Sequence, residues 1–427
     1  MSQIVVPLNS PEATNTDLFG PKGANQSALG QAGLPIPDGF CLSAEAYRIQ
    51  LKANGLEEPI AKLADADMQE ARLMFNDIRI AFFDKPIAAE VLEPLVAAYH
   101  DLAARSKTPI VVRSSALVED REGTSFAGQF ESFMGLADET EFLTAVRACW
   151  AALWSTRALR YMGSHGIVPS DTAMALLVQP LIDAVSSGGG LSETATGGML
   201  LSATWGLGEA IAQGEVVPDR YELNKDGVLN ESVMGHKTHQ LGCHLHDAKP
   251  SAVVEKDRRD EPCLNDDQVH ELAGYLRQAA DMIGRAAEIE WARDEDGFKM
   301  LQVRPLQMEK SEIPEEIWAG HPGMSGHPAG IGWGSGRACV INCECELSRV
   351  APGDILVTQV AGPSLSRILP MVAGVVAELG GSTSHLASLA RERGIPMVLG
   401  VHEATKTIPD GAQVAVDGVA GIVRWME

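Results

Sequence analysis

A two-glycine turn that leads into a short helix constrains this chain more than any other segment. Residues 380–396 read GGSTSHLASLARERGIP, which predicts a helix that begins at His385 and ends before Gly394 and Pro396. A histidine at this position has a nucleophilic ring nitrogen beside backbone N–H groups and the positive end of the helix dipole. These features suit a phosphoryl group carried on the ring. Taken alone, however, such a histidine is more often a cap or a surface residue.

The charge of the chain limits its partners. The sequence has 427 residues, with 34 Lys and Arg against 57 Asp and Glu, and a formal net charge of −23. Its length predicts two or three domains. Its negative charge argues against nucleic acid and anionic membranes as partners, and means that ATP would need local basic residues and Mg²⁺. We see no signal-peptide pattern and no apolar run long enough for a membrane span, so we expect a cytoplasmic protein.

The cysteine pattern gives no support for a metal site. The seven cysteines are scattered, and Cys343 and Cys345 form the one close pair. A zinc site would need a second pair of Cys or His residues at a suitable spacing. We therefore expect reduced, mostly buried thiols.

Local patterns divide the chain into three stretches. Residues 1–308 mix helical and strand patterns and end in an apolar strand at 300–305. Residues 309–331 are rich in proline and glycine and predict a flexible linker. In 332–427 we expect short strands, with helical segments between some of them. These strands are expected at 338–341, 354–358, 374–378, 397–400, 413–417 and 421–425.

The linker would give the last stretch a long reach. When extended, about 20 residues span at most about 65–70 Å, so a small tethered domain can visit two distant sites. Two Gly-His-Pro triplets, at 320–322 and 326–328, lie in this segment. We interpret them as a local duplication without catalytic meaning.

The first stretch has groups that suit a nucleotide. Lys22 lies in the Gly-Pro-Lys-Gly run at 20–23, which fits a lysine in a surface turn equally well. Residues 110–116 predict a buried strand that carries Arg113 and two serine hydroxyls, and a glycine-bearing loop at 124–132 follows. Small residues let the backbone approach phosphates, and Arg113 would supply charge to a transferring phosphoryl group.

A predicted hairpin carries candidate metal ligands. Strand alternation puts Glu288 and Glu290 on one face of the first strand, and Gln302 and Arg304 on one face of the second. Pairing of the two strands would bring carboxylate, amide oxygen and guanidinium together, which suits Mg²⁺ and a phosphate beside it. Taken alone, the pattern fits a solvated hairpin with cross-strand charge pairs better.

Both ends of the chain resemble the PEP-utilising dikinase family, which includes PEP synthases, pyruvate phosphate dikinases and rifampin phosphotransferases. The segment 380–396 resembles the family's phosphohistidine segment, and the string VRSSALVEDREGTSFAGQFES at 112–132 resembles its ATP-binding domain. The resemblance covers nearly all of 15–308 and 332–427. It implies an α/β multidomain chain, with an ATP-grasp domain at 1–308, a linker at 309–331 and a swivelling β/β/α phosphohistidine domain at 332–427.

The resemblance also assigns roles to single residues. His385 corresponds to the residue that carries the phosphoryl group, and Arg113 and Arg304 correspond to catalytic cations. Gln179 lies in a strand that resembles the adenine hinge, and Glu209 in a loop whose glutamate contacts the nucleoside. The residues expected to bind the nucleotide or the phosphoryl group are Lys22, Arg113, Gly128, Gln179, Glu209 and Thr383.

The hairpin and the histidine helix receive further roles from the same resemblance. Glu290 and Gln302 are expected to bind Mg²⁺. Thr383 and Ser384 are expected to hydrogen-bond the phosphate. Arg391, two turns further along the helix, either offsets the charge of the phosphate or is a surface residue of the helix.

The chain departs from the family in three places. After the hinge the family has a Ser-Gly-Val-x-Phe-Thr-x-Asp-Pro run, whereas residues 186–194 read SSGGGLSET, which puts the local loop structure and the closure on the nucleotide in doubt. The PEP/pyruvate TIM barrel of the PEP synthases has no counterpart. Neither has the acceptor-binding domain of rifampin phosphotransferase.

The implied chemistry is transfer of the β-phosphoryl group of ATP to His385, with AMP and phosphate as products, followed by transfer to an acceptor. Three hypotheses follow. The protein is a phosphotransferase whose acceptor is held by a partner subunit, or a self-sufficient kinase of a phenol, alcohol or antibiotic bound between domains, or a phosphohistidine carrier or nucleotide sensor without turnover. A role that takes phosphate from PEP is disfavoured, because the ATP half is present and the barrel is not.

Overall fold

The structure is a computed structural model of the chain. It describes residues 4–426 apart from 64–65, 67, 120–129, 131, 157, 159–161, 164–165, 195–196, 242–250, 307–317 and 319.

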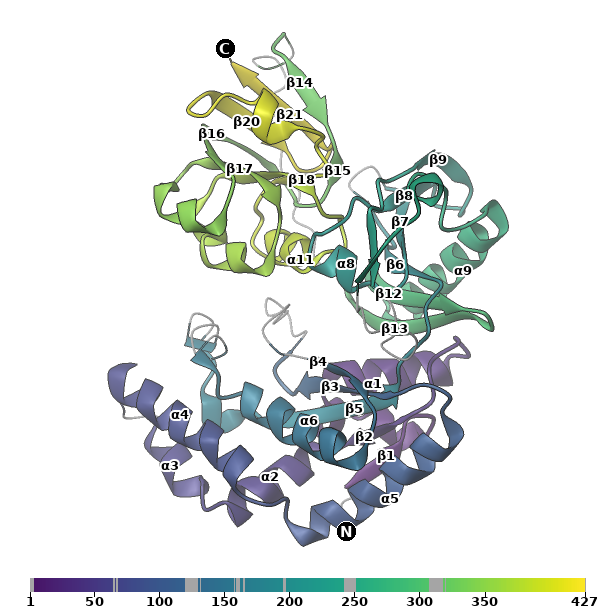
Figure 1. Cartoon of the computed structure of the whole chain (residues 1–427), viewed down its shortest axis with the longest axis vertical. Coiled ribbons are helices and arrows are strands. Elements are labelled where there is room, and N and C mark those ends of the chain that lie inside the picture. Colours follow the sequence, from purple (N-terminus) through teal and green to yellow (C-terminus); the bar gives the residue numbers. More distant parts are fainter. Residues whose placement is uncertain are drawn as a thin grey trace. The chain divides into compact units, whose positions relative to one another are not determined.

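The chain divides into two compact units. Figure 1 colours the chain by residue number, from purple at the N-terminus to yellow at the C-terminus. The first contains Met1–Asp183 and Lys299–Val303, and the second contains most of 184–298 together with Arg304–Glu427. The boundary near residue 183 lies inside the stretch 1–308, so that stretch contains two separately packed parts. The domain limits at 308 and 332 remain predictions.

The first unit is built on an antiparallel sheet of five strands in the order β1-β2-β5-β3-β4. The strands β3 and β5 are almost entirely buried, in keeping with the aliphatic run at 110–112 of β3 and the mostly apolar sequence MALLVQP of β5. The strands are β1 (Val5–Pro7), β2 (Phe40–Leu42), β3 (Ile110–Ala116), β4 (Ser132–Leu136) and β5 (Met174–Pro180). The α-helices are α1 (Thr16–Gln31), α2 (Ala44–Ala53), α3 (Glu57–Lys62), α4 (Met68–Asp84), α5 (Ala89–Arg105) and α6 (Glu139–Ala152).

Large aromatic side chains fill the core of the first unit. Tyr47, Trp150 and Trp154 are fully buried. Their polar atoms are partly satisfied inside the core, since Nε1 of Trp154 donates a hydrogen bond to the hydroxyl of Tyr47 at 2.8 Å. This core fixes α2 and α6 to the sheet that presents β3.

The second unit begins with a six-stranded sheet in the order β13-β12-β6-β7-β8-β9. The strands are β6 (Ser186–Leu191), β7 (Met199–Trp205), β8 (Asp219–Leu223), β9 (Leu229–Val233), β12 (Ala287–Asp294) and β13 (Gly297–Pro305). The helices α8 (Glu209–Ala212) and α9 (Asp266–Ile283) and the hairpin of β10 (His239–Leu241) and β11 (Ser251–Val253) accompany it. Residues 186–191, whose structure the sequence left in doubt, form the strand β6, which pairs with β12 on one side and β7 on the other.

Helix α9 follows local sequence rules closely. Asn265 and Gln268 form a capping box at its start, and Gly284 ends it in a left-handed conformation. Its buried residues include Val269, Leu272 and Leu276, which recur with the helical period. The side chain of Leu276 packs toward Gly190 of β6, so α9 covers one face of the six-stranded sheet.

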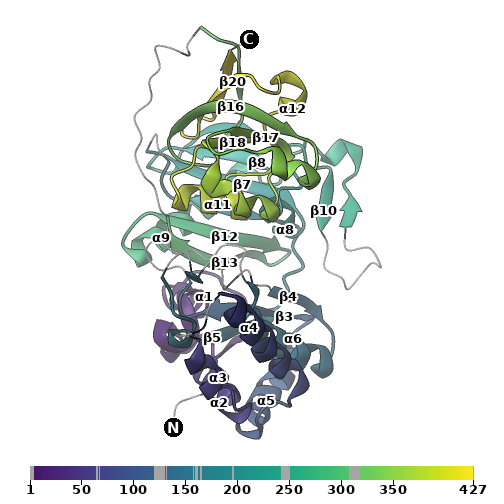
Figure 2. The ribbon, with the colours of Figure 1, turned by 90° about the vertical axis from the view of Figure 1, so that its left-hand side faces the viewer.

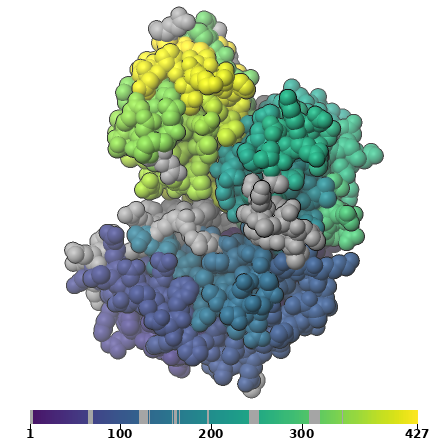
Figure 3. Space-filling model, viewed as in Figure 1, coloured from purple at the N-terminus to yellow at the C-terminus, as the bar shows by residue number. Residues whose placement is uncertain are grey.

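An eight-stranded sheet completes the second unit, in the order β14-β21-β20-β16-β17-β18-β19-β15. The strands β16 to β19 run parallel to one another, and the outer pairs are antiparallel. The strands are β14 (Gly323–Ser325), β15 (His327–Pro328), β16 (Trp333–Ile341), β17 (Ile355–Val360), β18 (Gly374–Leu379), β19 (Met397–Leu399), β20 (Gln413–Asp417) and β21 (Ile422–Met426), with helices α11 (His385–Glu392) and α12 (Ala404–Thr407) between them. All six strands predicted in 332–427 are therefore confirmed. These residues, green to yellow, form one continuous body in the space-filling view (Figure 3).

The C-terminal part of the segment 309–331 is not free chain, contrary to the expectation of a flexible linker along its whole length. β14 pairs with β21, and β15 pairs with β19. Proline and glycine do not prevent such short edge strands, because only a few backbone hydrogen bonds are needed. Any tether therefore ends before Gly323, and most of its remaining length, 307–317 and 319, lies outside the described residues.

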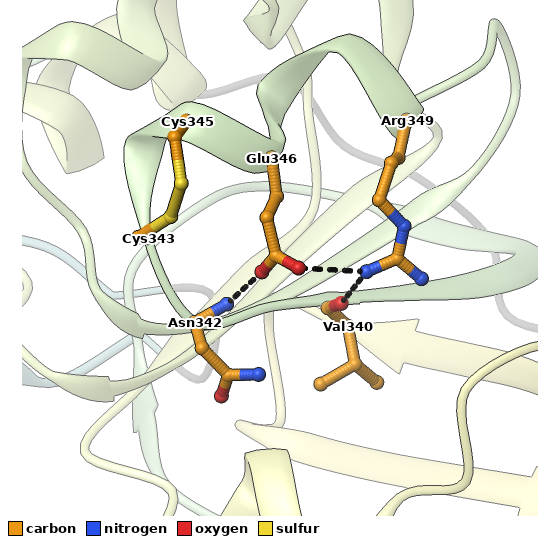
Figure 4. Close-up of a disulfide and its surroundings, with 6 residues drawn as sticks. All are labelled: Val340, Asn342, Cys343, Cys345, Glu346 and Arg349. Atoms are coloured by element: carbon orange, nitrogen blue, oxygen red, sulfur yellow. Dashed lines mark hydrogen bonds and ion pairs between the residues drawn. A yellow bond between two sulfur atoms is a disulfide. The ribbon is translucent and has the colours of Figure 1, made fainter.

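The expectation of reduced cysteines is wrong for one pair. Cys343 and Cys345 form a disulfide at the start of a 3-10 helix (Glu344–Arg349), as Figure 4 shows. The turn holds their Cα atoms 5.3 Å apart, a spacing that a disulfide can bridge. Four other cysteines are buried, as expected, and take no part in this disulfide: Cys41, Cys149, Cys263 and Cys339.

No helix within the described parts of the chain is both long enough and apolar enough to cross a membrane.

Candidate active site

His385 is the first residue of α11, as the sequence predicted. Ser384 is the N-cap, and its side chain accepts a hydrogen bond from the backbone N–H of Ala387 at 3.2 Å. Leu386 and Leu389 are buried, whereas His385 is only partly buried. The helix thus presents the imidazole at its N-terminal end, where the helix dipole favours an anion.

Thr383, two residues before the histidine, lies against the six-stranded sheet. Its hydroxyl is 2.9 Å from that of Ser202 on β7. The strand register places Gly189 of β6 opposite Ser202 and, on its other side, opposite Glu290 of β12. Directly opposed residues of neighbouring strands share a face, so Ser202, Gly189 and Glu290 form one row across three strands. Thr383 rests over the middle of this row.

Glu288 lies two residues before Glu290 on β12, on the same face of the strand, and is bound by two arginines. Nε of Arg304 on β13 donates to Oε2 of Glu288 at 3.1 Å, and Nη2 of Arg304 lies 3.0 Å from Oε1. Nη2 of Arg391 on α11 donates to the same Oε2 at 2.9 Å (Figure 2 shows α11 and β12). Burial alone would raise the pKa of Glu288, but the two guanidinium groups outweigh it and hold the pKa below its usual range.

Arg391 is therefore not a surface residue of its helix, and that alternative is wrong. Only 5% of it is exposed. Its Nη1 donates to the backbone oxygens of Ser382 and of Ala329, the latter at 3.2 Å. One guanidinium thus joins Glu288 of β12 to the turn that precedes the histidine.

Ser388 adds a third contact between α11 and the hairpin. Its hydroxyl lies 3.3 Å from Oε1 of Glu288 and accepts a hydrogen bond from Arg304. It also lies 3.2 Å from the backbone oxygen of Ser384. No sequence pattern singles out Ser388, although its position one turn after Ser384 follows from the helical period.

In the first unit, Lys22 is held by a buried carboxylate. Its Nζ lies 2.9 Å from Oε1 of Glu119, whose side chain is 1% exposed. Burial raises the pKa of Glu119, and the positive charge of Lys22 opposes this rise. The lysine is thus fixed by an internal partner, not by a surface turn.

Sterics explain why position 20, two residues before Lys22, is a glycine. Gly20 has a φ of +66°, and a Cβ atom there would lie 2.4 Å from the backbone oxygen of Ser115 on β3. The hydroxyl of Ser115 donates to the backbone oxygen of Phe19 at 2.7 Å and accepts from the N–H of Gly23 at 3.1 Å. This hydroxyl therefore serves to join α1 to β3.

Arg113, on β3, points at the segment Lys299–Val303 of the same unit. Nη1 donates to the backbone oxygen of Leu301 at 2.7 Å, and Nη2 donates to the side-chain oxygen of Gln302 at 2.9 Å. The structure thus brings together two residues that the sequence assigned to phosphoryl transfer and to the metal.

The remaining predicted nucleotide ligands lie in separate places along the chain. Gln179 is buried on β5, and its Nε2 has no hydrogen-bond partner among the described residues, which fits a donor to a bound ligand. Glu209 begins α8, and its carboxylate accepts from Nε2 of Gln213 at 3.0 Å. Gly128 lies outside the described residues.

The hairpin fits a partial set of Mg²⁺ ligands. Glu290 is partly buried on β12, Gln302 is buried on β13, and these strands are neighbours in the sheet. The described residues hold no group of three or more His, Cys, Asp or Glu that could bind a metal. Mg²⁺ commonly takes only one or two protein oxygens and completes its shell with phosphates and water, so the carboxylate of Glu290 and the amide oxygen of Gln302 are of a suitable chemical type, and their assignment to the metal remains a prediction. Glu288, neutralised by two arginines, does not fit this role.

Two positions that lie against Thr383 were not singled out in the sequence. Ser202 lies in an ordinary apolar strand and gives no signal of its own. Gly189 belongs to the glycine run that departs from the family pattern, and this run was the available signal. The reason for a glycine at position 189 becomes clear only from the position of Thr383, which is distant in sequence.

Both parts of the chain match known families. Residues 16–320 match the family described as pyruvate phosphate dikinase, AMP/ATP-binding domain. Residues 350–421, which include His385, match the family described as PEP-utilising enzyme, mobile domain. The α/β multidomain class expected from the sequence is confirmed.

Among full-length relatives, the phosphoenolpyruvate synthase of Pyrococcus furiosus is 30% identical over 95% of this chain and 56% of its own length. That of Aeropyrum pernix is 33% identical over 95% and 56%, and that of Escherichia coli is 29% identical over 98% and 57%. The chain therefore spans little more than half the length of these relatives. With its nucleotide-binding and mobile domains both matched, the chain belongs to the PEP-utilising dikinase family of pyruvate phosphate dikinase and phosphoenolpyruvate synthase.

Proposed function

We propose that this chain is an ATP-dependent phosphotransferase of the dikinase type. The β-phosphoryl group of ATP is transferred to His385, the γ-phosphoryl group is transferred to water, and the first-stage products are AMP, phosphate and phosphohistidine. The phosphohistidine then passes its phosphoryl group to an acceptor. The main supporting observation is that the segment with His385 contacts the face of the six-stranded sheet that carries Glu288 and Glu290. The strands of this sheet belong to the region that matches the nucleotide-binding family.

The residues around His385 suit a phosphoryl group. A lone pair of the imidazole, expected on Nε2, forms the new N–P bond to the β-phosphorus while the P–O bond to the α-phosphate breaks and AMP leaves with its electrons. Water then attacks the γ-phosphorus, the P–O bond between the β and γ groups breaks, and phosphate leaves. The N-terminal end of α11 and the hydroxyl of Thr383 offer positive potential and a hydrogen-bond donor to the phosphoryl oxygens. Catalysis would then depend mainly on positioning and charge neutralisation.

Lys22, Arg113 and Arg304 supply the cations for the triphosphate. Gln179 and Glu209 are the proposed contacts to the base and the nucleoside, and Gly128 contributes a loop backbone. Glu290 and Gln302 would hold Mg²⁺, which when bound neutralises phosphate charge. The partial ligand set and the buried unpartnered donor of Gln179 support these assignments.

The acceptor is proposed to reach the phosphohistidine either on a partner subunit or in a site of this chain. Phosphohistidine formation requires neither. Phosphorylated chain, freed of nucleotide, can therefore be offered candidate acceptors separately: small alcohols and phenols, pyruvate, or the products of neighbouring genes.

The test uses ATP labelled at the β or the γ phosphorus, with Mg²⁺ and the intact chain. The β label should be retained on the protein, AMP should form, and the γ label should appear as free phosphate. His385→Ala should abolish retention, whereas His402→Ala, at an exposed histidine of the same part, should leave it unchanged. Formation of ADP alone, or retention of γ label, would overturn the proposal.

A further inference from the structure

We propose that Gly189, Ser202 and Glu288 form a docking receptor for the histidine-bearing segment, and that Arg391 is the positioning residue that couples docking to the shape of the turn before His385. This inference deepens the proposed function and rests on it for its meaning. The docking contacts themselves can be tested without any phosphoryl transfer.

The receptor has a space for Thr383 above Gly189, which we call the seat. A Cβ atom built on Gly189 would lie 2.5 Å from Cγ2 and 2.6 Å from Cβ of Thr383, closer than real side chains approach. Glycine at this position therefore leaves the space that the threonine occupies. On the flank of the seat, Ser202 meets the threonine hydroxyl at 2.9 Å, so the contact is directional as well as steric.

A second contact point carries charge. Arg391 and Glu288 are 6% and 5% exposed in their side chains, and their atoms approach to 2.9 Å. A buried carboxylate that loses such a partner is left with less counter-charge, which is costly. Arg304 and Glu288 lie on neighbouring strands, β13 and β12, so their ion pair does not depend on docking. Arg391 of α11 is the partner that docking adds.

Arg391 also binds the backbone of the turn that precedes His385. The same guanidinium that binds Glu288 through Nη2 donates through Nη1 to the backbone oxygen of Ser382, one residue before the seated threonine. The planar fork of arginine can serve both acceptors at once, which the single ammonium of lysine cannot reproduce. Docking on Glu288 and the geometry of residues 382–384 are therefore linked through one side chain.

Disulfide trapping measures docking directly. The close approach of the two hydroxyls predicts that the double variant Ser202→Cys/Thr383→Cys forms a bond between these positions under mild oxidation in the full chain. The cross-linked peptide is identified by mass spectrometry, which separates it from pairs formed by native cysteines. Each single cysteine variant serves as the blank.

Variants of Arg391 then test the coupling. In the trapping background, Arg391→Gln should slow cross-linking at least about tenfold, because a buried ion pair loses one partner. Arg391→Lys should slow it less, and Arg393→Gln, two residues on, should leave it unchanged. Glu288→Gln should act in the same pathway, so that its effect and that of Arg391→Gln are not additive. Equal trapping in all variants would overturn the inference.

The seat is tested by two alanine substitutions. In the same trapping background, Gly189→Ala should slow cross-linking because its methyl group would lie 2.6 Å from the Cβ atom of residue 383, which the cysteine keeps. Gly274→Ala on α9 is the matched control, since a Cβ there meets nothing within 4 Å. Melting temperatures of all variants separate loss of docking from unfolding, because a purely structural defect would lower the melting temperature in parallel with the trapping rate.

The two proposals fail in different ways. If trapping depends on Arg391 but no label reaches His385, docking stands and the chemistry is wrong. If label reaches His385 in the wild type and trapping ignores Arg391, the chemistry stands and this inference is wrong.

Discussion

Nη2 of Arg113 donates a hydrogen bond at 2.9 Å to the side-chain oxygen of Gln302, the oxygen that we assign to Mg²⁺. A carbonyl oxygen has two lone pairs, so it can accept from the arginine and still serve a cation. The pair therefore joins the residue proposed to neutralise phosphoryl charge to the residue proposed to bind the metal.

Removal of Arg113 should impair transfer more than folding. We expect Arg113→Ala to slow retention of the β label by about 10²–10³-fold, the usual effect of losing one preorganised stabilising group. Arg79→Ala, at an exposed arginine on α4, is the control and should change the rate little. The rate is measured by rapid quench with β-labelled ATP. A rate within about twofold of wild type would remove Arg113 from the mechanism.

The pairing of Lys22 with Glu119 predicts a pH-dependent loss of stability. In Lys22→Met the buried carboxylate loses its cation, at a cost of about 3–5 kcal/mol in the free energy of unfolding at neutral pH. The pKa of Glu119 is raised by burial, so its neutral form favours folding, and this contribution fades as pH rises through the folded-state pKa. The deficit of Lys22→Met should therefore shrink in acid.

Urea unfolding at several pH values checks this expectation. Adding Glu119→Gln to Lys22→Met should restore much of the stability at neutral pH, because no buried charge is then left unpaired. Lys107→Met, at an exposed lysine, supplies the control. A deficit that is independent of pH and survives Glu119→Gln would contradict the ion-pair explanation.

Glu288 predicts the opposite pH trend. Its folded-state pKa lies below the ordinary value of about 4.3, so the ionised group stabilises the fold above that pH. This contribution is lost as pH falls through the lower folded-state pKa. The stability gap between wild type and Glu288→Gln should be widest at neutral pH and should narrow in strong acid. Glu193→Gln, at an exposed glutamate, should show no gap, and a gap that widens in acid would be contrary evidence.

Local signals were enough to predict the histidine helix and most of the last sheet. Glycine and proline mark the ends of its short apolar runs, and the strand expected at 413–417 coincides with β20. The start of α11 at His385 follows from the cap at Ser384, which needs no distant residue.

The contacts that define the candidate site could not be predicted in the same way. Glu288 and Arg391 are separated by 103 residues, and each reads locally as a charge on a strand or a helix. β14 and β15 are too short to show a period, and they exist because β21 and β19 offer them partners. Pairing across such distances is set by tertiary packing, which one sequence does not reveal.

The second Gly-His-Pro triplet contains a histidine with a structural consequence. His327 is buried on β15, its Nδ1 has no hydrogen-bond partner among the described residues, and burial, followed by the charge of Arg220, lowers its pKa to about 4. In the unfolded chain this imidazole has a pKa of about 6.5, so between about pH 6.5 and 4 it is protonated in the unfolded state but not in the folded state. The free energy of unfolding should therefore fall by up to about 3 kcal/mol as pH drops through this range. His327→Phe should flatten this slope, measured by urea unfolding across that range, whereas His321→Phe in the first triplet should keep it. An unchanged slope in His327→Phe would show that other groups cause the acid sensitivity.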